Sequence, residues 1–352
     1  MYPRVIIHRD KYHHNVEKIA TLCAQHGITI SVVTKVFCAE QPLIDVLNVC
    51  DVSYVADSRI ANLQKMHTHL PRMLLRIPSM HEAETVVKVA DISLNSEIET
   101  IRRLNDAAAK ERVRHKIVLM MDVGDLREGL FFKDDVENTV QAILSLSHIE
   151  LYGLGTNLTC YGGVIPDQES LGRLGDMVVM LKQKYQLELK MVSGGNSSHL
   201  YLLQEGQHPP FINHLRIGEA IVLGRETAYG KPMPDLYQDV FVLESDLIEL
   251  KKKPSIPMGK IGMNAFGKTP QFEDYGLMDR GILAIGKQDV DYHELIPEDP
   301  TIRLIGSSSD HLIIDLTHAK ASYKVGDILR FRLTYGSVLS LMTSRYVRKV
   351  YV

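Results

Sequence analysis

The feature that most constrains this fold is a regular alternation of short apolar segments with helical patterns over the first two thirds of the chain. The apolar segments are rich in Val, Ile and Thr, which is typical of strands buried on both faces. We predict eight strands, at 28–36, 52–56, 73–77, 92–94, 116–122, 150–156, 188–193 and 212–217. Helices are predicted at 10–25, 41–49, 58–66, 80–89, 96–110, 136–146, 169–185 and 197–205. Eight strands alternating with helices predict a (β/α)8 TIM barrel. A doubly wound sheet is less favoured because no glycine-rich phosphate turn follows the first strand.

The pattern changes near residue 231, where prolines become frequent and the later runs alternate or are β-branched. Such runs are typical of strands, and we place them at 240–250, 281–285, 301–304, 311–316, 328–333 and 346–351. The prediction is therefore an α/β protein of two domains. Residues 1–230 form the barrel and 231–352 a mainly β C-terminal domain. Residues 1–8, a short strand, belong to the first domain or, alternatively, join the second.

Composition excludes several classes of protein. The formal net charge is -3 and no basic stripe is present, so nucleic acid is not an expected partner. No apolar run is long enough to span a membrane, and the N-terminus lacks the pattern of a signal peptide. The 4 cysteines show no CxxC spacing and no metal-binding pattern with histidine. We therefore expect free thiols, a cytoplasmic location and no metal.

Polar residues stand where several predicted strands end, which is where barrels carry their active sites. Lys35 ends the first strand. A lysine there either extends its ammonium into solvent or has a chemical use. Arg127 follows the fifth strand and is either a surface residue or a clamp for a carboxylate. Arg216 lies in the apolar eighth strand and needs an acceptor, for which an ion pair with Glu219 is one option.

The turn after the seventh strand reads Ser-Gly-Gly-Asn-Ser-Ser from Ser193 to Ser198. The two glycines allow a tight turn, and the following residues offer hydroxyls and N–H groups to an anion. An ordinary helix cap is the alternative. Gly218 follows the eighth strand, and barrels often hold phosphate at these two turns. A lysine, a phosphate site and a buried arginine at one barrel mouth together predict pyridoxal 5'-phosphate as cofactor.

The chain resembles the fold-type III pyridoxal-phosphate enzymes of the alanine racemase group over essentially its full length, and within them the ornithine racemase subgroup most. The segments that carry this resemblance are VVTKV, DVGDLREG, GLGTNLTCYGGVIP, SGGNSS, HLRIGEAIVLGRETAYG and AIGKQDVD. The longer segments are specific, whereas VVTKV alone is weak. The resemblance implies a racemase that interconverts L- and D-amino acids by removing the α-proton.

The resemblance also implies a role for individual residues. Lys35 would form the Schiff base and act as a catalytic base, and Arg127 would hold the substrate carboxylate. Arg216 would face the pyridine nitrogen, and Asp310 aligns with a substrate-site Met-Asp pair. The remaining cofactor-binding positions are Asn157 at the ring, Asn196, Ser197, Gly218 and Glu219 at the phosphate, and Tyr346 near the phosphate-capping tyrosine.

Three departures from the family pattern concern the substrate and the second base. Lys287 stands where alanine racemases have a tyrosine base, Met120 where many have a lysine, and Ala39 where they have a tyrosine. The resemblance implies that the second base comes from the C-terminal domain of a partner subunit, and so it also implies a homodimer with shared active sites. Lys287 is the first candidate, and the others are Asp289, Asp310, His311, Cys160 and Tyr161.

The acidic residues Asp289, Asp291 and Asp310 favour ornithine or lysine as substrate because a carboxylate can pair with a distal ammonium. These aspartates can also be ordinary turn formers. An alanine or broad-specificity racemase is one alternative function. A fold-type III D-amino-acid aldolase or dehydratase is another, and such enzymes usually need a metal near the cofactor. A non-enzymatic cofactor-binding barrel is disfavoured because such proteins lack the second domain.

Overall fold

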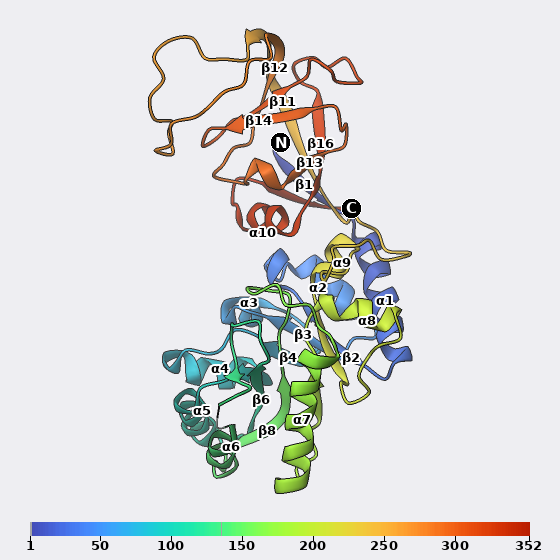
Figure 1. Ribbon diagram of the computed structural model, residues 1–352, viewed down its shortest axis with the longest axis vertical. Helices are drawn as coiled ribbons and strands as arrows, with labels where there is room; N and C mark the ends of the chain where they lie inside the picture. Colours follow the sequence, from blue (N-terminus) through green and yellow to red (C-terminus); the bar gives the residue numbers. More distant parts are fainter. Residues whose placement is uncertain (1, 135) are drawn as a thin grey trace. The chain divides into compact units, whose positions relative to one another are not determined.

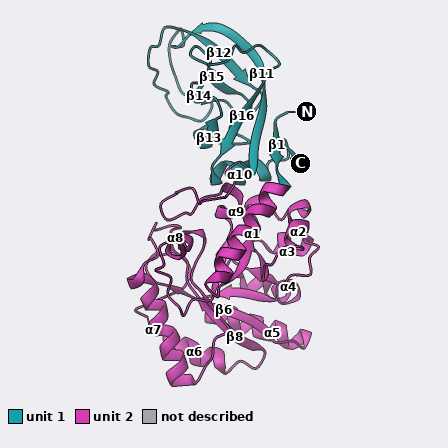
Figure 2. Cartoon of the chain, turned by 90° about the vertical axis from the view of Figure 1, so that its right-hand side faces the viewer, with its two compact units in different colours: residues 1–9, 239–352 teal, residues 10–238 magenta. Residues whose placement is uncertain are grey.

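The computed structural model describes residues 2–134 and 136–352 and divides the chain into two compact units (Figure 2). One comprises residues 10–238, and the other comprises residues 1–9 and 239–352. The junction therefore lies at 238/239, whereas the sequence pattern places it at 230/231.

Hydrogen bonds explain why the segment up to residue 238 stays with the first unit. Asn15 donates to the carbonyl of Tyr237 at 2.8 Å and accepts from its backbone N–H at 2.8 Å. The N–H of Met233 donates to Gly224 at 2.9 Å. These bonds attach the segment to helices of the first unit.

The first unit is a closed barrel of eight parallel strands (Figure 1). Its strands are β2 (Thr29–Val33), β3 (Tyr54–Asp57), β4 (Arg72–Leu74), β5 (Ile92–Asn95), β6 (His115–Asp122), β8 (Ile149–Gly155), β9 (Met191–Ser193) and β10 (His214–Ile217). The order is β5-β4-β3-β2-β10-β9-β8-β6, and the β5–β6 pairing closes the ring. The two-residue β7 (Leu130–Phe131) pairs with β6 outside the ring. The sequence prediction of a TIM barrel is thus confirmed.

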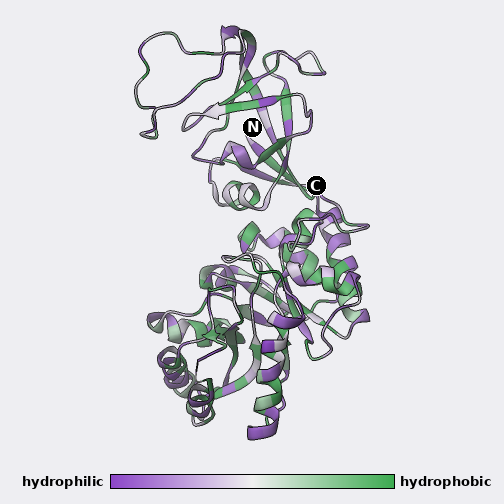
Figure 3. Cartoon of the chain, in the orientation of Figure 1, coloured by the Kyte–Doolittle hydropathy of each residue, from purple (hydrophilic) through white to green (hydrophobic). Residues whose placement is uncertain are grey.

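Helices connect the strands, and all of those listed here except α9 lie where the sequence predicts a helix. They are α1 (Arg9–Gln25), α2 (Gln41–Leu47), α3 (Ile60–Lys65), α4 (Ala83–Val89), α5 (Ile98–Glu111), α6 (Val136–Leu144), α7 (Gln168–Tyr185), α8 (Leu200–Gln204) and α9 (Glu219–Leu223). Single 3-10 turns are η1 (Lys35–Phe37), η2 (Met80–Glu82) and η3 (Ser197–His199). Hydrophilic and hydrophobic turns alternate along α7 in Figure 3, and Leu171, Leu174 and Leu181 form its buried face. Such a stripe packs a helix against a sheet.

Apolar side chains fill the barrel interior. Met120 is fully buried in this cluster, so the position where many alanine racemases carry a lysine is here part of the core. The other buried members are Val33, Ala56, Met73, Ile92, Leu94, Val118 and Met191.

The second unit is built on antiparallel strands. They are β11 (Phe241–Pro254), β12 (Leu277–Leu283), β13 (Leu295–Pro297), β14 (Arg303–Ser307), β15 (Leu312–Asp315) and β16 (Ile328–Leu333), ordered β13-β16-β11-β12-β15-β14. The sheet also contains β1 (Arg4–Ile7), which pairs with β11 antiparallel and with β17 (Arg348–Tyr351) parallel. The short η4 (Tyr292–Glu294) and the helix α10 (Tyr335–Thr343) complete the unit.

Among the described residues, the helices and strands that were not predicted from the sequence are β7, α9, β13 and α10, and the short turns η1 and η4 were not predicted either. Among the described residues, no helix is both long enough and apolar enough to cross a membrane.

Candidate functional site

Lys35 is the first residue of η1, directly after β2. The preceding Thr34 holds this position, since its N–H donates to Ala56 at 2.8 Å and its hydroxyl donates to Asp57 at 2.7 Å. Burial, and then the positive charge of Arg127, lower the pKa of the Lys35 amine. Within residues 2–134 and 136–352 its ammonium group has neither a hydrogen bond nor an ion pair. Lys35 is therefore a half-buried amine without a fixed partner.

The turn after Lys35 is conformationally strained. Cys38 and Ala39 have φ values of 54° and 50°, in the left-handed region that residues with a Cβ rarely adopt. The Ala39 N–H donates to the Thr34 carbonyl at 3.2 Å, which closes the turn. Strained backbone of this kind persists only where the surroundings over-determine it, and it is common at functional sites.

Arg216, on β10, is buried and has no carboxylate partner among the described residues. Its guanidinium donates to the hydroxyl of Ser193, to the carbonyl of Thr156 at 2.7 Å and to Oδ1 of Asn157 at 3.4 Å. Burial lowers the pKa of Arg216 to about 10, which still leaves the group charged near neutral pH. A buried cation held by neutral acceptors is costly, so an acceptor supplied by a ligand would stabilise it.

His214 lies two residues before Arg216 and supports it through Ser193. The His214 Nδ1 is 2.9 Å from the Ser193 hydroxyl, and its Nε2 is 2.8 Å from the Ser31 hydroxyl. Burial lowers the pKa of His214 to about 3, so the ring is neutral. Ser31 donates to the sulfur of Met73 at 3.8 Å, which leaves its oxygen to accept from Nε2–H. Ser193 can then donate to Nδ1 while it accepts from Arg216.

The turn after β9 is organised by Asn196. Its Oδ1 accepts from the Ser198 N–H at 2.8 Å, and its Nδ2 donates to the Leu158 carbonyl at 2.7 Å and to Oδ1 of Asn157 at 3.2 Å. The hydroxyl of Ser197 accepts from the Ala220 N–H at 3.1 Å, which joins this turn to the one after β10. Two buried groups here, Nδ2 of Asn157 and Oγ of Ser198, have no hydrogen-bond partner in the described chain.

The turn after β10 contains Gly218 and Glu219. A Cβ on Gly218 would lie 3.1 Å from Cβ of Val33, so a larger residue would press on β2. The Glu219 carboxylate accepts from Arg225 Nη2 at 2.8 Å. The ion pair between Arg216 and Glu219 that the sequence allowed is therefore absent, because Arg225 takes that carboxylate.

Arg127 lies on the long loop after β6. It forms an ion pair with Glu128, and its Nη1 is 2.6 Å from the sulfur of Cys160. Asp125 ties this loop to the one after β8 by accepting from the N–H groups of Tyr161 at 3.1 Å and Val164 at 3.0 Å. Arg127 is thus held at the carboxyl ends of β6 and β8, and Cys160 lies beside it.

The other predicted residues belong to the second unit. Lys287 is exposed, with its Nζ 4.3 Å from the centroid of the Phe266 ring. The buried Asp289 accepts from the Ser344 hydroxyl at 2.6 Å. Both residues line a cavity of about 420 Å³, and the other lining residues are Gln288, Val290, Asp291, Ser340, Thr343 and Ser344.

Asp310 is exposed at the turn between β14 and β15. The hydroxyls of Ser308 and Ser309 each donate to it at 3.1 Å, and these bonds and the neighbouring His311 lower the pKa of the Asp310 carboxyl. Tyr346 precedes β17 and is 66% exposed.

The first unit therefore brings together Lys35, Asn157, Asn196, Ser197, Arg216 and Gly218 at the carboxyl ends of the barrel strands, with Arg127 on an adjoining loop. The first unit is thus a closed parallel barrel that carries an amine, a buried arginine and a tight Gly-Gly-Asn-Ser turn at the carboxyl ends of its strands. A β-rich unit follows it in sequence. This combination defines a class of barrel enzymes. Sequence reasoning missed the supporting roles of His214, Ser31 and Ser193. The alternating polar positions on β10 were the available signal for His214.

The chain belongs to the alanine racemase family, since the family model "Alanine racemase, N-terminal domain" matches residues 7–226. It is 47% identical over 350 residues to a protein of Acetoanaerobium sticklandii named ornithine racemase, covering 99% of both chains. It is 38% identical over 354 residues to a protein of Thermotoga maritima named lysine racemase, covering 100% of this chain and 99% of that one.

Solved structures agree on the fold. The alanine racemase of Bartonella henselae, described with covalently bound pyridoxal phosphate, superposes with a TM-score of 0.76 at 16% identity. The match covers 100% of both chains. The similarity therefore includes the β-rich second unit as well as the barrel.

Proposed function

We propose that this protein is a pyridoxal-phosphate-dependent racemase of basic amino acids, with ornithine as the first candidate substrate and lysine as the second. The full-length similarity to proteins named ornithine racemase and lysine racemase carries this proposal. The arrangement at the barrel mouth supports it, because the half-buried Lys35 and the buried Arg216 are both suited to a cofactor.

The residues present fit pyridoxal phosphate. Asn157 Nδ2 and Ser198 Oγ are buried hydrogen-bonding groups without partners among the described residues, and such groups are costly unless a ligand satisfies them. Lys35 offers an amine for the aldehyde, and Arg216 a cation for the pyridine nitrogen. Asn196, Ser197, Gly218 and the backbone of Glu219 would hold the phosphate, with Tyr346 proposed near it. When bound, the cofactor would hold the substrate amino group and delocalise the charge left by loss of the α-proton.

The chain's own groups would handle the proton and the substrate carboxylate. Lys35 is proposed as one base, because its lowered amine pKa brings the neutral form closer to neutral pH. Arg127 is proposed to orient the substrate carboxylate, which its guanidinium can bind through two parallel hydrogen bonds. Arg216 keeps its charge, so a pyridine nitrogen bound beside it would stay unprotonated. The cofactor would then withdraw electrons less strongly, which would disfavour side reactions.

Racemisation needs a proton donor on the second face, and we propose Lys287 of a partner subunit in a homodimer with shared active sites. Its Nζ contacts an aromatic face and forms no ion pair in the described chain, which leaves the amine free for proton transfer. Asp289, Asp310, His311, Cys160 and Tyr161 are the alternatives.

We propose that acidic groups select the distal ammonium of the substrate. Asp289 and Asp291 line the cavity that also contains Lys287, and Asp310 carries a further carboxylate in the same unit. An exposed ion pair contributes little, so discrimination needs at least one carboxylate that is shielded from water. Asp289 is the buried one.

The test is a panel of single-enantiomer ornithine, lysine, arginine, serine and alanine, with products separated by chiral chromatography. We expect kcat/KM for ornithine or lysine to exceed that for alanine by at least about tenfold, which equals about 1.4 kcal/mol. Equal or faster turnover of alanine would refute the basic substrate. Cleavage products in place of the opposite enantiomer would refute racemisation.

The Lys35→Ala variant tests the cofactor lysine. We expect racemisation to fall by at least about 10²–10⁴-fold, the usual contribution of a catalytic base, and the cofactor's visible absorbance to be lost on gel filtration. The matched control is Lys18→Ala, on the exposed face of α1, which should keep both. Retained absorbance and activity in the Lys35 variant would contradict the assignment.

The reducing cytoplasm is the proposed location. No disulfide joins the four cysteines in the described part of the chain, and Cys160 is exposed.

A further inference from the structure

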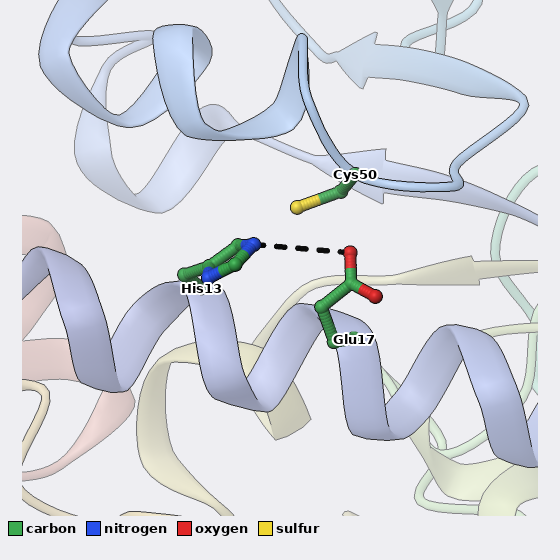
Figure 4. A group of neighbouring side chains, drawn as sticks. All are labelled: His13, Glu17 and Cys50. Atoms are coloured by element: carbon green, nitrogen blue, oxygen red, sulfur yellow. Dashed lines mark ion pairs between the residues drawn. The ribbon is translucent and has the colours of Figure 1, made fainter.

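Three side chains of types that can bind a metal lie close together on and beside the first helix (Figure 4). His13 and Glu17 lie four residues apart on α1 and so share one face, with His13 Nε2 3.9 Å from a Glu17 carboxylate oxygen. Cys50 comes from the turn between α2 and β3. Its sulfur points toward the space between the other two groups in Figure 4. One donor atom from each residue lies within 4.8 Å of the other two.

We propose that His13, Glu17 and Cys50 bind Zn²⁺ or a similar divalent transition-metal ion. Imidazole nitrogen, thiolate sulfur and carboxylate oxygen are the three ligand types that zinc uses, whereas magnesium and calcium prefer oxygen alone. Side-chain exposure is 49% for His13 and 44% for Glu17, while Cys50 is 9% exposed. The sulfur ligand is therefore buried, whereas the imidazole and carboxylate ligands face solvent. A water molecule could then occupy the fourth position of a tetrahedral site.

Binding requires no oxidant or reductant. Without metal, the Cys50 thiol donates to the Val46 carbonyl at 3.2 Å. On binding, a metal–sulfur bond replaces the S–H bond, and the thiol proton passes to solvent. The ion would then join α1 to the turn after α2, two segments that are connected along the chain by β2 and the Lys35 turn.

Cobalt binding to the full-length protein, after treatment with a chelator, tests this site. Co²⁺ takes the place of zinc and gives a thiolate-to-metal charge-transfer band in the near ultraviolet. We expect the band to saturate at one equivalent and to be absent in Cys50→Ser. His13→Ala and Glu17→Gln should each weaken binding by at least about tenfold. The matched control is Cys160→Ser, which removes an exposed thiol far along the chain and should retain the band.

Two results would overturn the proposal. One is the absence of a charge-transfer band in the unmodified chain, and the other is a band that survives in Cys50→Ser. The helix-surface variants His13→Ala and Glu17→Gln keep the test valid if the buried Cys50 variant fails to fold, because unchanged cobalt affinity in both would also contradict the site.

Discussion

At the scale of single residues, a network of buried hydrogen bonds positions Arg216. Arg216 is held by Ser193, and Ser193 is shared with His214, whose other nitrogen bonds Ser31. This series of hydrogen bonds links β2, β9 and β10 behind the mouth of the barrel. The neutral His214 ring forms hydrogen bonds through both nitrogens and so fixes the Ser193 hydroxyl. Because this hydroxyl accepts from Arg216, buried residues determine the direction in which the guanidinium points.

His214→Ala should destabilise the protein by about 2–4 kcal/mol. The change leaves two buried hydroxyls short of a partner and a cavity the size of an imidazole ring. Urea denaturation followed by circular dichroism measures the free energy of unfolding. His81→Ala is the control, because His81 is exposed on η2 and its loss should cost less than about 0.5 kcal/mol. A His214 variant as stable as the control would show that the network contributes nothing.

At the scale of elements, the close approach of neighbouring barrel strands gives a sharp prediction. A Cβ on Gly153 of β8 would overlap the carbonyl oxygen of Met191 on β9, which pairs with it. Gly153→Ala should therefore destabilise the barrel by several kcal/mol, because backbone in a closed sheet cannot move aside.

Gly172→Ala is the matched substitution on a helix. Gly172 lies within α7, and a Cβ there would meet nothing within 4 Å. This change should stabilise the protein by about 0.5–1 kcal/mol, since alanine favours the helix. Thermal unfolding of both variants checks the pair, and shifts in the same direction would contradict the packing argument.

How far the sequence predicts each element depends on its local signal. The eight barrel strands were predicted because buried parallel strands read as β-branched runs. The five-residue α9 reads Glu-Ala-Ile-Val-Leu, which is too short and too uniformly apolar to show a period. The helix α10 did carry a signal, a capping box from Thr334 to Ser337 before a run of apolar residues, and it was missed.

The residues of the candidate site also divide into those that the sequence pattern predicts and those that it does not. Lys35, Arg216 and the turn around Asn196 follow directly from strand ends, because the carboxyl ends of parallel strands meet at one edge. The cluster of His13, Glu17 and Cys50 could not be predicted, since its donors come from separate segments whose meeting depends on helix packing. The ion pair between Arg225 and Glu219 was also missed, because the two residues are six apart and meet across the unpredicted α9.

At the scale of the whole molecule, three buried histidines make stability depend on pH. Burial lowers the pKa of His115 to about 4 and the pKa values of His199 and His214 to about 3, from 6.5. In the unfolded chain these rings bind protons near pH 6.5, so below that pH the unfolded state holds more protons than the folded state. The free energy of unfolding should therefore fall with falling pH, by about 1.4 kcal/mol per pH unit for each ring.

Urea denaturation at pH 7.5 and pH 5 measures this effect. His115→Gln can still hydrogen-bond Ser93, which contacts the histidine at 2.8 Å, and it removes one of the three protonation sites. The pH dependence should shrink by about a third in this variant. Equal stability of the unmodified protein at both pH values would contradict the role of the buried rings.

The position of β1 has a consequence for synthesis of the chain. Its apolar residues Val5 and Ile7 are fully buried between β11 and β17, whose first residues are Phe241 and Arg348. Because a ribosome adds about 5–20 residues per second, this segment would wait roughly ten to fifty seconds for its first neighbour to emerge. The barrel residues can assemble during that interval, while an apolar strand edge stays open to other nascent chains. Slower or more crowded translation should therefore lower the yield through aggregation at the N-terminus.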